Sequence, residues 1–172
     1  MNLQSNDFEL FGVSAQFAQD RVALDTHWKE LQREAHPDRF AAQGAAAQRL
    51  AMQWSVRINE AYRRLKDPLK RASYLCELNG VPISAETNTA MPPAFLMQQM
   101  AWREALDEAQ TIDELNQIAA MPRQVMLEQL SKIEHLLDVD KRYDAAAEQV
   151  RGLMFTERFA SEVDARIDQL GQ

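Results

Sequence analysis

The sequence has one cysteine, Cys76, and only five glycines and six prolines in 172 residues. A single cysteine excludes an internal disulfide framework and a zinc site of paired cysteines, and it fits a reducing compartment. We interpret Cys76 as a buried, unreactive side chain. Because turn-forming residues are few and strand-like alternation is nearly absent, the sequence predicts an all-α protein.

Long apolar runs are also missing. No stretch approaches the roughly 18 uninterrupted apolar residues that cross a membrane. Residues 1–11 carry Asp7 and Glu9 and lack the basic region that opens a signal peptide. With 46% hydrophobic residues the chain can still form a core, so we expect a soluble, cytoplasmic protein with no membrane partner.

Positive charge is scarce in the second half of the chain. Residues 1–80 contain 11 Lys and Arg against 10 Asp and Glu, whereas residues 81–172 contain 8 against 16. A net charge of −7 without a stripe dense in lysine or arginine argues against nucleic acid as a partner. The uneven charge indicates that the two halves bind different partners.

Two amphipathic segments dominate the first half. Apolar residues at helical spacing predict one helix over about 19–35 and another over about 45–66, which would pack as an antiparallel hairpin. Residues 8–13 predict a small helix that ends near Gly12, and Pro68 starts a short helix that runs to Leu78. The apolar stripes of the hairpin consist of Leu24, Trp28, Leu31 and Ala35, and of Leu50, Trp54, Ile58, Ala61 and Leu65.

The hairpin turns at His36-Pro37-Asp38. Pro37 has no N–H for a helix and disfavours the α conformation at His36, so the chain must turn and expose an imidazole beside a carboxylate. An acid–base pair or half of a metal site is one interpretation, and a simple turn is another. No cysteine cluster, glycine-rich phosphate loop or nucleophile elbow supports catalysis, so we expect neither a catalytic residue nor a metal or cofactor.

The second half predicts a bundle of about three helices. Residues 80–93 contain three prolines and suit a linker or docked loop, after which Pro92-Pro93 start a helix over 94–109. Thr111 and Glu114 are spaced as a capping box. Pro122 predicts a break or kink near Met121, and a last helix is expected over about 142–170. We interpret all three tryptophans as core anchors: Trp28, Trp54 and Trp102.

Taken together, these motifs carry a family resemblance. The hairpin with His36-Pro37-Asp38, followed by Asp67-Pro68, resembles a J domain. In the second half the segments AFLMQQM (94–100), REALDE (103–108) and YDAAA (143–147) resemble the C-terminal domain of the HscB co-chaperones. The resemblance covers nearly the whole chain and implies a J domain over 1–79, a linker over 80–93 and a three-helix scaffold-binding domain over 94–172.

The resemblance implies a non-enzymatic adaptor of iron–sulfur cluster assembly. Its J domain would stimulate the ATPase of an HscA-type chaperone, and its C-terminal bundle would deliver the IscU-type scaffold protein. By matching position, the chaperone-stimulating motif is His36-Pro37-Asp38. The scaffold-binding residues implied in the same way are Leu96, Met97, Met100, Glu104, Glu108 and Phe155.

The sequence departs from the family pattern in three places. Ala101 stands where bacterial relatives often have an acidic residue, so one polar contact with the scaffold is in doubt. The segment around Met121-Pro122 differs from the usual charged helix, and the cysteine-rich N-terminal extension of many eukaryotic relatives is absent. The bundle, moreover, could carry a different client to a chaperone.

Helical geometry supports the scaffold surface without the family. At 100° per residue, Phe95, Gln99, Trp102 and Leu106 cluster on one side of the helix over 94–109, and the Leu/Met set with its two glutamates lies nearly opposite. One side must pack in the bundle, so the other is exposed as a partner site unless the helix is buried on both sides. Without the resemblance, the helical spacing of Phe155, four residues before Phe159, predicts a core residue. Beside the turn, Lys29, Arg33 and Arg39 can either face solvent or steer an acidic chaperone surface, with Arg57 a less certain contributor.

Overall fold

The computed structural model describes residues 2–84 and 91–171, and every regular element in these ranges is helical. Residue contacts divide the chain into two compact units, Met1–Leu75 and Cys76–Gln172. The prediction of an all-α fold is confirmed. Part of the predicted linker, residues 85–90, lies outside the described residues.

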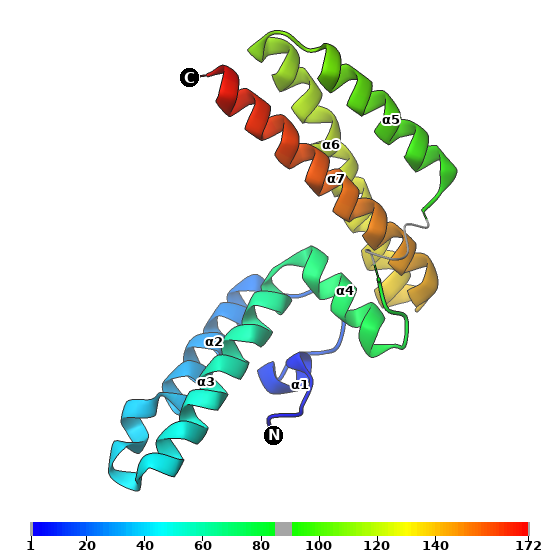
Figure 1. Ribbon diagram of the computed structural model, residues 1–172. Helices are drawn as coiled ribbons and strands as arrows, with labels where there is room; N and C mark the ends of the chain where they lie inside the picture. Colours follow the sequence, from blue (N-terminus) through cyan, green and yellow to red (C-terminus); the bar gives the residue numbers. More distant parts are fainter. Residues whose placement is uncertain (1, 85–90, 172) are drawn as a thin grey trace. The chain divides into compact units, whose positions relative to one another are not determined.

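The first unit is built on a helical hairpin. Helix α2 (Arg21–Ala35) and helix α3 (Ala45–Lys66) lie side by side, as the prediction of a hairpin required (Figure 1). Asp20 caps α2 by accepting hydrogen bonds from the backbone N–H groups of Val22 and Ala23. Between the two helices runs a 3₁₀ segment, η1 (Pro37–Gln43), and Gly44 follows with a φ of 99°.

A small first helix, α1 (Asp7–Phe11), completes the core of this unit. It ends at Gly12, whose φ of 64° is the left-handed conformation that glycine adopts at helix ends. Phe8 and Phe11 are fully buried, together with Leu24 from α2 and Ile58 and Leu65 from α3. Helix α4 (Pro68–Leu78) starts where Asp67 accepts the backbone N–H groups of the next turn.

The expected apolar stripes are only partly buried. Leu50 is half exposed, and four other stripe residues are of intermediate burial, so five of the nine are not fully buried: Trp28, Leu31, Ala35, Leu50 and Trp54. Trp28 instead stacks on Tyr62 and donates its indole N–H to the Oδ1 atom of Asn59. A polar network of side chains therefore occupies part of the interface between α2 and α3, where the stripe pattern predicted apolar contact alone.

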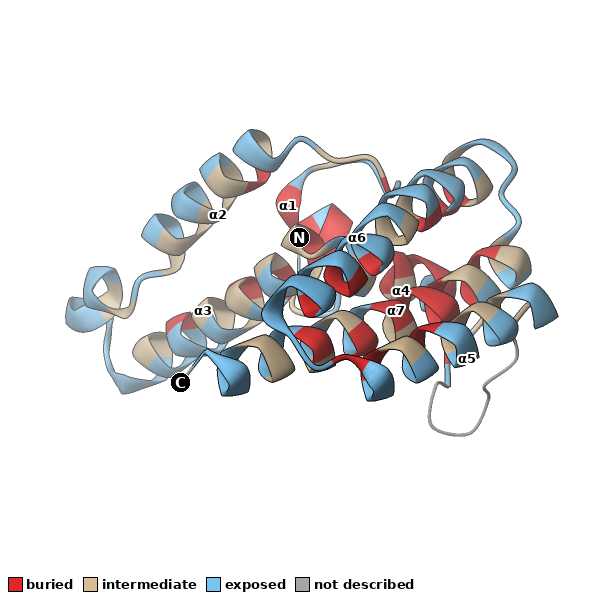
Figure 2. Cartoon of the chain, turned by 90° about the horizontal axis from the view of Figure 1, so that it is seen from above, coloured by how far each residue is buried: buried red, intermediate tan, exposed pale blue. Residues whose placement is uncertain are grey.

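The second unit is a three-helix bundle of α5 (Pro93–Glu108), α6 (Ile112–Glu134) and α7 (Tyr143–Leu170). Figure 2 shows that the buried residues of these helices gather on their inner faces. One end of the core holds Leu115 and Val163 around the stacked rings of Trp102 and Phe159. The expectation that Trp102 anchors the core is confirmed.

Helix α6 both confirms and corrects the sequence analysis. Thr111 and Glu114 form the predicted capping box. Of the predicted break or kink near Met121, the break is wrong, because α6 continues as an α-helix through Pro122, which is buried. Packing along α7 stabilises the helix despite the hydrogen bond that proline cannot donate. The departure from α geometry comes later, in a π-helical turn, η2 (His135–Val139).

The described start of the segment after α4 is docked on the bundle. Ile83 is buried, and its carbonyl oxygen accepts a hydrogen bond from the Arg151 guanidinium of α7 at 3.1 Å. Cys76 is buried as expected, and desolvation raises the pKa of its thiol to about 11. Such a thiol remains protonated at neutral pH and is a poor nucleophile, which agrees with its interpretation as an unreactive side chain.

Candidate partner-binding surfaces

The His36-Pro37-Asp38 turn lies at the exposed end of the hairpin. Helix α2 ends at Ala35, and His36 has an extended backbone with ψ of 128° before Pro37 opens η1. The backbone N–H of Asp38 donates to the Nδ1 atom of His36 at 3.2 Å. Because Nδ1 accepts this bond, the neutral imidazole carries its proton on Nε2.

Both polar side chains of the turn are available to a partner. The Asp38 side chain is 92% exposed and its carboxylate lies 3.7 Å from the Nδ1 atom of His36, which is itself 57% exposed. Among the residues that the structure describes, no group of three histidine, cysteine or acidic side chains gathers as metal ligands. His27 is engaged elsewhere, with its Nδ1 atom 2.6 Å from the carbonyl oxygen of Phe11. The turn therefore presents a donor and an anion to solvent.

Three basic residues accompany the turn. Lys29 and Arg33, four residues apart on α2, are exposed on one side of the helix, and Arg39 is exposed in η1. Arg39 is tied to the turn because its backbone N–H donates to the carbonyl oxygen of His36 at 3.0 Å. Its guanidinium also reaches the carbonyl oxygen of Arg33 at 3.4 Å. The structure thus ties Arg33 and Arg39 together at the turn, whereas Lys29 lies seven residues before His36 on α2.

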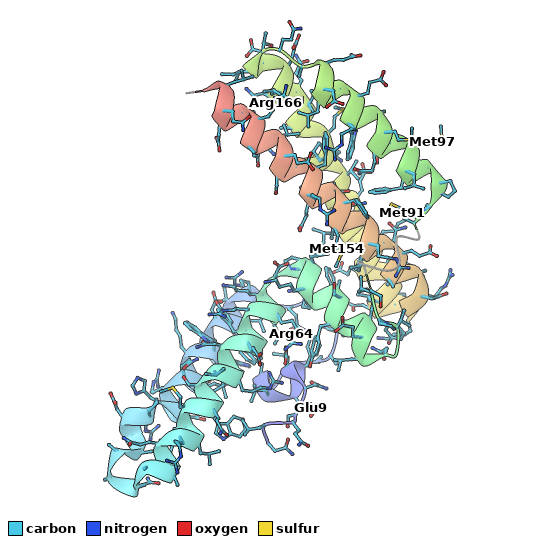
Figure 3. The ribbon with its side chains drawn as sticks, in the orientation of Figure 1. Glu9, Arg64, Met91, Met97, Met154 and Arg166 are labelled. Carbon is cyan, nitrogen blue, oxygen red and sulfur yellow. The ribbon has the colours of Figure 1, made fainter. Side chains whose placement is uncertain are left out.

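A second surface lies on α5. Met97 and Met100 are 72% and 73% exposed and Leu96 is 48% exposed, whereas Trp102 and Leu106 on the other side of the helix are buried. Figure 3 places Met97 on the outer side of α5. The alternative in which both sides of this helix are buried is wrong. We call Leu96, Met97, Met100, Glu104 and Glu108 the α5 surface.

Acidic side chains border the α5 surface. Glu104 and Glu108 are exposed, and with Met97 and Met100 they line a shallow hollow along the helix. Arg103 is paired with Glu162 of α7, which raises the pKa of the guanidinium and engages its charge within the bundle. The hollow therefore combines exposed thioether side chains with carboxylates, a pattern found at protein–protein interfaces.

Phe155 and Ala101 occupy different positions relative to this hollow. Ala101 is among its lining residues, so the missing acidic side chain leaves a small apolar site there. Phe155 does not line it: the ring is half-buried on α7, four residues before buried Phe159, with the Arg158 guanidinium 5.4 Å from its centroid. Its intermediate burial lies between the core role suggested by sequence spacing and the partner role implied by resemblance.

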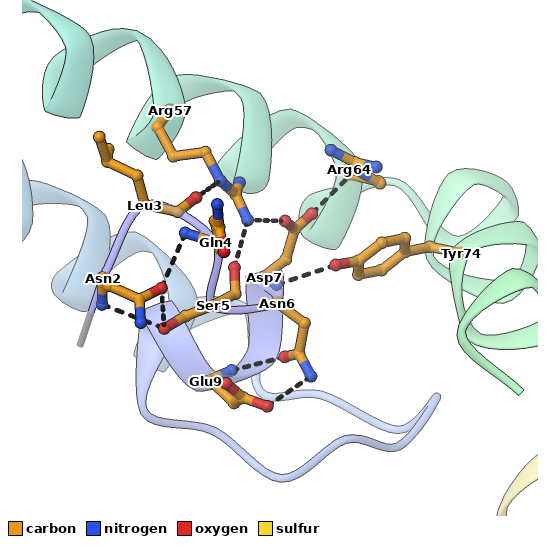
Figure 4. Close-up of polar contacts among 10 residues, drawn as sticks. All are labelled: Asn2, Leu3, Gln4, Ser5, Asn6, Asp7, Glu9, Arg57, Arg64 and Tyr74. Carbon is orange, nitrogen blue, oxygen red and sulfur yellow. Dashed lines mark hydrogen bonds and ion pairs between the residues drawn. The ribbon is translucent and has the colours of Figure 1, made fainter.

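Sequence reasoning missed a buried ion-pair cluster in the first unit, shown in Figure 4. The carboxylate of Asp7 is completely buried and lies 2.8 Å from both the Arg57 and Arg64 guanidinium groups. The Asp7 backbone N–H donates to the hydroxyl of Tyr74 at 3.0 Å, and burial raises the pKa of that phenol. Arg57 therefore holds α1 against α3 and is not a member of the exposed basic group. The available signal was an acidic residue directly before the apolar side chains of the opening segment.

Comparison with known families gives a consistent result. The family described as "HSCB C-terminal oligomerisation domain" matches residues 91–164. The chain is 52% identical over 173 residues to a protein of Burkholderia multivorans described as a co-chaperone protein HscB homolog, with 99% of this chain and 98% of that protein covered. A Burkholderia vietnamiensis protein of the same description is 51% identical over the same shares.

Solved structures agree with this similarity. The chaperone HscB of Vibrio cholerae superposes with a TM-score of 0.82 at 35% identity, covering 96% of this chain and 99% of that one. Human co-chaperone HscB superposes with a TM-score of 0.89 over 96% of this chain and 84% of that one. At 23% identity, the similarity to the human structure shows only that the fold is shared. In the described part of the chain, no helix is long and apolar enough to cross a membrane.

Proposed function

The chain belongs to the HscB family of co-chaperones, and on this premise we propose that it stimulates the ATPase of an HscA-type chaperone and delivers an IscU-type iron–sulfur scaffold protein to it. The observation that carries the proposal is the α5 surface, whose exposed Leu/Met side chains stand opposite a buried side of the same helix. A client-binding surface in one unit and a J-domain turn in the other are what an adaptor requires.

In this proposal the turn acts on the chaperone and performs no chemistry of its own. The proton on the Nε2 atom of His36 and the carboxylate of Asp38 offer a donor and an acceptor at the contact, and Pro37 fixes the backbone between them. Lys29, Arg33 and Arg39 would steer the turn toward an acidic surface of the chaperone. Hydrolysis then takes place in the partner's own active site.

The scaffold would be held chiefly by apolar contact with α5. Leu96, Met97 and Met100 supply flexible, polarisable area that adapts to a partner, and Glu104 and Glu108 supply carboxylates at its border. We include Phe155 as a scaffold-binding residue, since its side chain is only partly buried on α7. We also propose functional limits of 1–79 for the J domain, 80–93 for the connection and 94–172 for the scaffold-binding domain.

The substitution His36→Gln tests the chaperone half of this proposal. The side chain is exposed, so the fold should survive while stimulation of the chaperone ATPase is lost. Glu60→Gln is the matched control, because Glu60 is exposed on α3 and its variant should stimulate as wild type does. A His36→Gln protein that stimulates normally would remove the turn from the mechanism.

A further inference from the structure

The second unit contains a cleft that the proposed function does not use. It is lined by the start of α5, the end of α6 and the first half of α7, and has a volume of about 740 Å³. This volume falls within the roughly 300–1,000 Å³ of ligand pockets. The residues that matter to its chemistry are Phe95, Gln98, Glu128, Gln129, Lys132 and Glu148.

Gln129 is the unusual member of this lining. The residue is only 5% exposed, and among the described residues neither the Oε1 nor the Nε2 atom of its amide has a hydrogen-bond partner. A buried donor and acceptor without partners lose hydration and gain nothing in exchange, so such groups are rare unless something completes them. Gln129 thus has an NH₂ group that donates and a carbonyl oxygen that accepts to offer to a bound group.

Two further features of the cleft lie near this amide: a glycine on α7 and a π-helical turn. A Cβ atom on Gly152 of α7 would lie 3.4 Å from the Nε2 atom of Gln129 and 3.4 Å from the Cζ atom of Phe95. The amide and the ring thus lie on either side of the α7 backbone at Gly152, where a side chain would be in contact with both. His135, which also lines the cleft, begins the π-helical turn η2, a geometry frequent at functional sites.

The lining also restricts the chemistry of a ligand. Glu128 and Glu148 outnumber Lys132 in charge, so the cleft does not favour an anion. No cluster of potential metal ligands is found among the described residues. A carboxamide pairs well with the N–H and C=O of one residue in an extended chain, because both groups point to the same side, as in paired strands. An extended polypeptide satisfies both atoms of Gln129.

We propose that the cleft receives an extended segment of the client protein held on α5, with the main chain of one client residue paired to the Gln129 amide. The half-buried Phe95 ring turns aside and packs against the segment. Gln98, which lines the cleft, follows Met97 of the α5 surface in the chain, so both sites lie on the same helix. The identification of the client as the scaffold protein rests on the proposed function.

The substitution Gln129→Met separates this role from a structural one. Methionine fills similar volume without a polar group, so the variant should melt at or above the wild-type temperature. Its affinity for the scaffold protein should fall about tenfold with the two lost hydrogen bonds. Gln117→Met, at an exposed position of α6, is the control that should change neither quantity. Unchanged scaffold affinity, or a clear loss of stability, would overturn the proposal.

A titration of the full chain tests the cleft without the scaffold. The probe is a capped Ala-Val-Ala tripeptide, compared with a depsipeptide in which an ester replaces the valine N–H. Saturable shifts of the Gln129 side-chain NH₂ resonances with the tripeptide, and several-fold weaker binding of the ester, are expected. No response, or an equal response to both probes, overturns the cleft. A wild-type chain that binds the tripeptide but not the scaffold contradicts the proposed function instead.

Discussion

The two units differ in what they bury and what they expose. The first unit buries a carboxylate between two arginines and exposes a charged turn. The second exposes leucine and methionine on α5 and buries an amide that has no partner among the described residues. The first unit therefore has charged side chains both in its interior and on its exposed turn, whereas the second unit exposes apolar side chains on α5. We expect the first to bind through electrostatics and the second through burial.

The largest effect should come from the buried charge of the first unit. Asp7→Ala leaves the Arg57 and Arg64 guanidinium groups without their carboxylate, and breaking a buried pair costs about 3–5 kcal/mol. Since Arg64 is partly exposed, we expect the lower end, about 3 kcal/mol, in urea unfolding. Asp38→Ala, at a 92% exposed carboxylate, is the matched control and should change stability by less than about 0.5 kcal/mol. Equal losses in the two variants would show that burial does not distinguish these aspartates.

The next effect concerns the apolar surface of the second unit. Leu96→Ala combined with Met97→Ala should weaken scaffold binding by about 2–4 kcal/mol, since each buried side chain contributes about 1.5–3 kcal/mol as an upper bound. Calorimetric titration with the scaffold protein measures it. Leu127→Ala, at a side chain that is 66% exposed on α6, should leave the affinity unchanged. If the double variant binds the scaffold as tightly as the Leu127→Ala control, the α5 surface is not the client site.

A smaller difference between the two units should be seen in how their binding affinities depend on salt. Exchanging Lys29 and Arg33 for glutamate should weaken chaperone binding by about 1 kcal/mol for each exposed pair lost, and the loss should shrink as salt screens the charges. Affinity for the chaperone should therefore fall more steeply between low and high ionic strength than affinity for the scaffold. Binding assays of both partners over one salt series provide the comparison, and equal slopes would contradict it.

The smallest effect is a pH-dependent one at the start of α6. Backbone N–H groups of Gln110 and Thr111 donate to the Glu114 carboxylate and lower its pKa from its ordinary value of 4.5. A lowered pKa in the folded state contributes stability that is present above pH 4.5 and lost as pH falls through the folded value. Glu114→Gln should melt lower than wild type near neutral pH, and the difference should disappear in acid. A difference that is constant with pH would exclude this carboxylate as its cause.

Much of this fold could be predicted from the sequence because its signals are local. Helical spacing, Gly12, Pro37, Pro68 and the Thr111 cap each act within a few residues, and the elements begin and end close to where those signals lie. The His36 turn and the Leu96–Met97 side of α5 were predictable for the same reason. Local spacing decides which side of a helix a residue occupies.

What failed depends on contacts between distant residues. Pro122 does not interrupt α6, because burial against the bundle compensates for one lost hydrogen bond. Helical spacing allows Arg57 a place beside the turn, but its guanidinium pairs with Asp7, fifty positions earlier in the chain. The cleft lining likewise brings together Phe95, Gln129 and Gly152 from three helices. Residue spacing within one helix does not predict such contacts between distant parts of the chain.

The ATPase rate of the HscA-type chaperone, with and without the IscU-type scaffold, tests the central claim that one chain links two partners. Wild type should stimulate alone and stimulate further with scaffold. The Leu96→Ala, Met97→Ala protein should keep the first increment and lose the second, and His36→Gln should lose both. If the α5 variant retains the scaffold-dependent increment, or the turn variant retains either, the two surfaces do not act together as proposed.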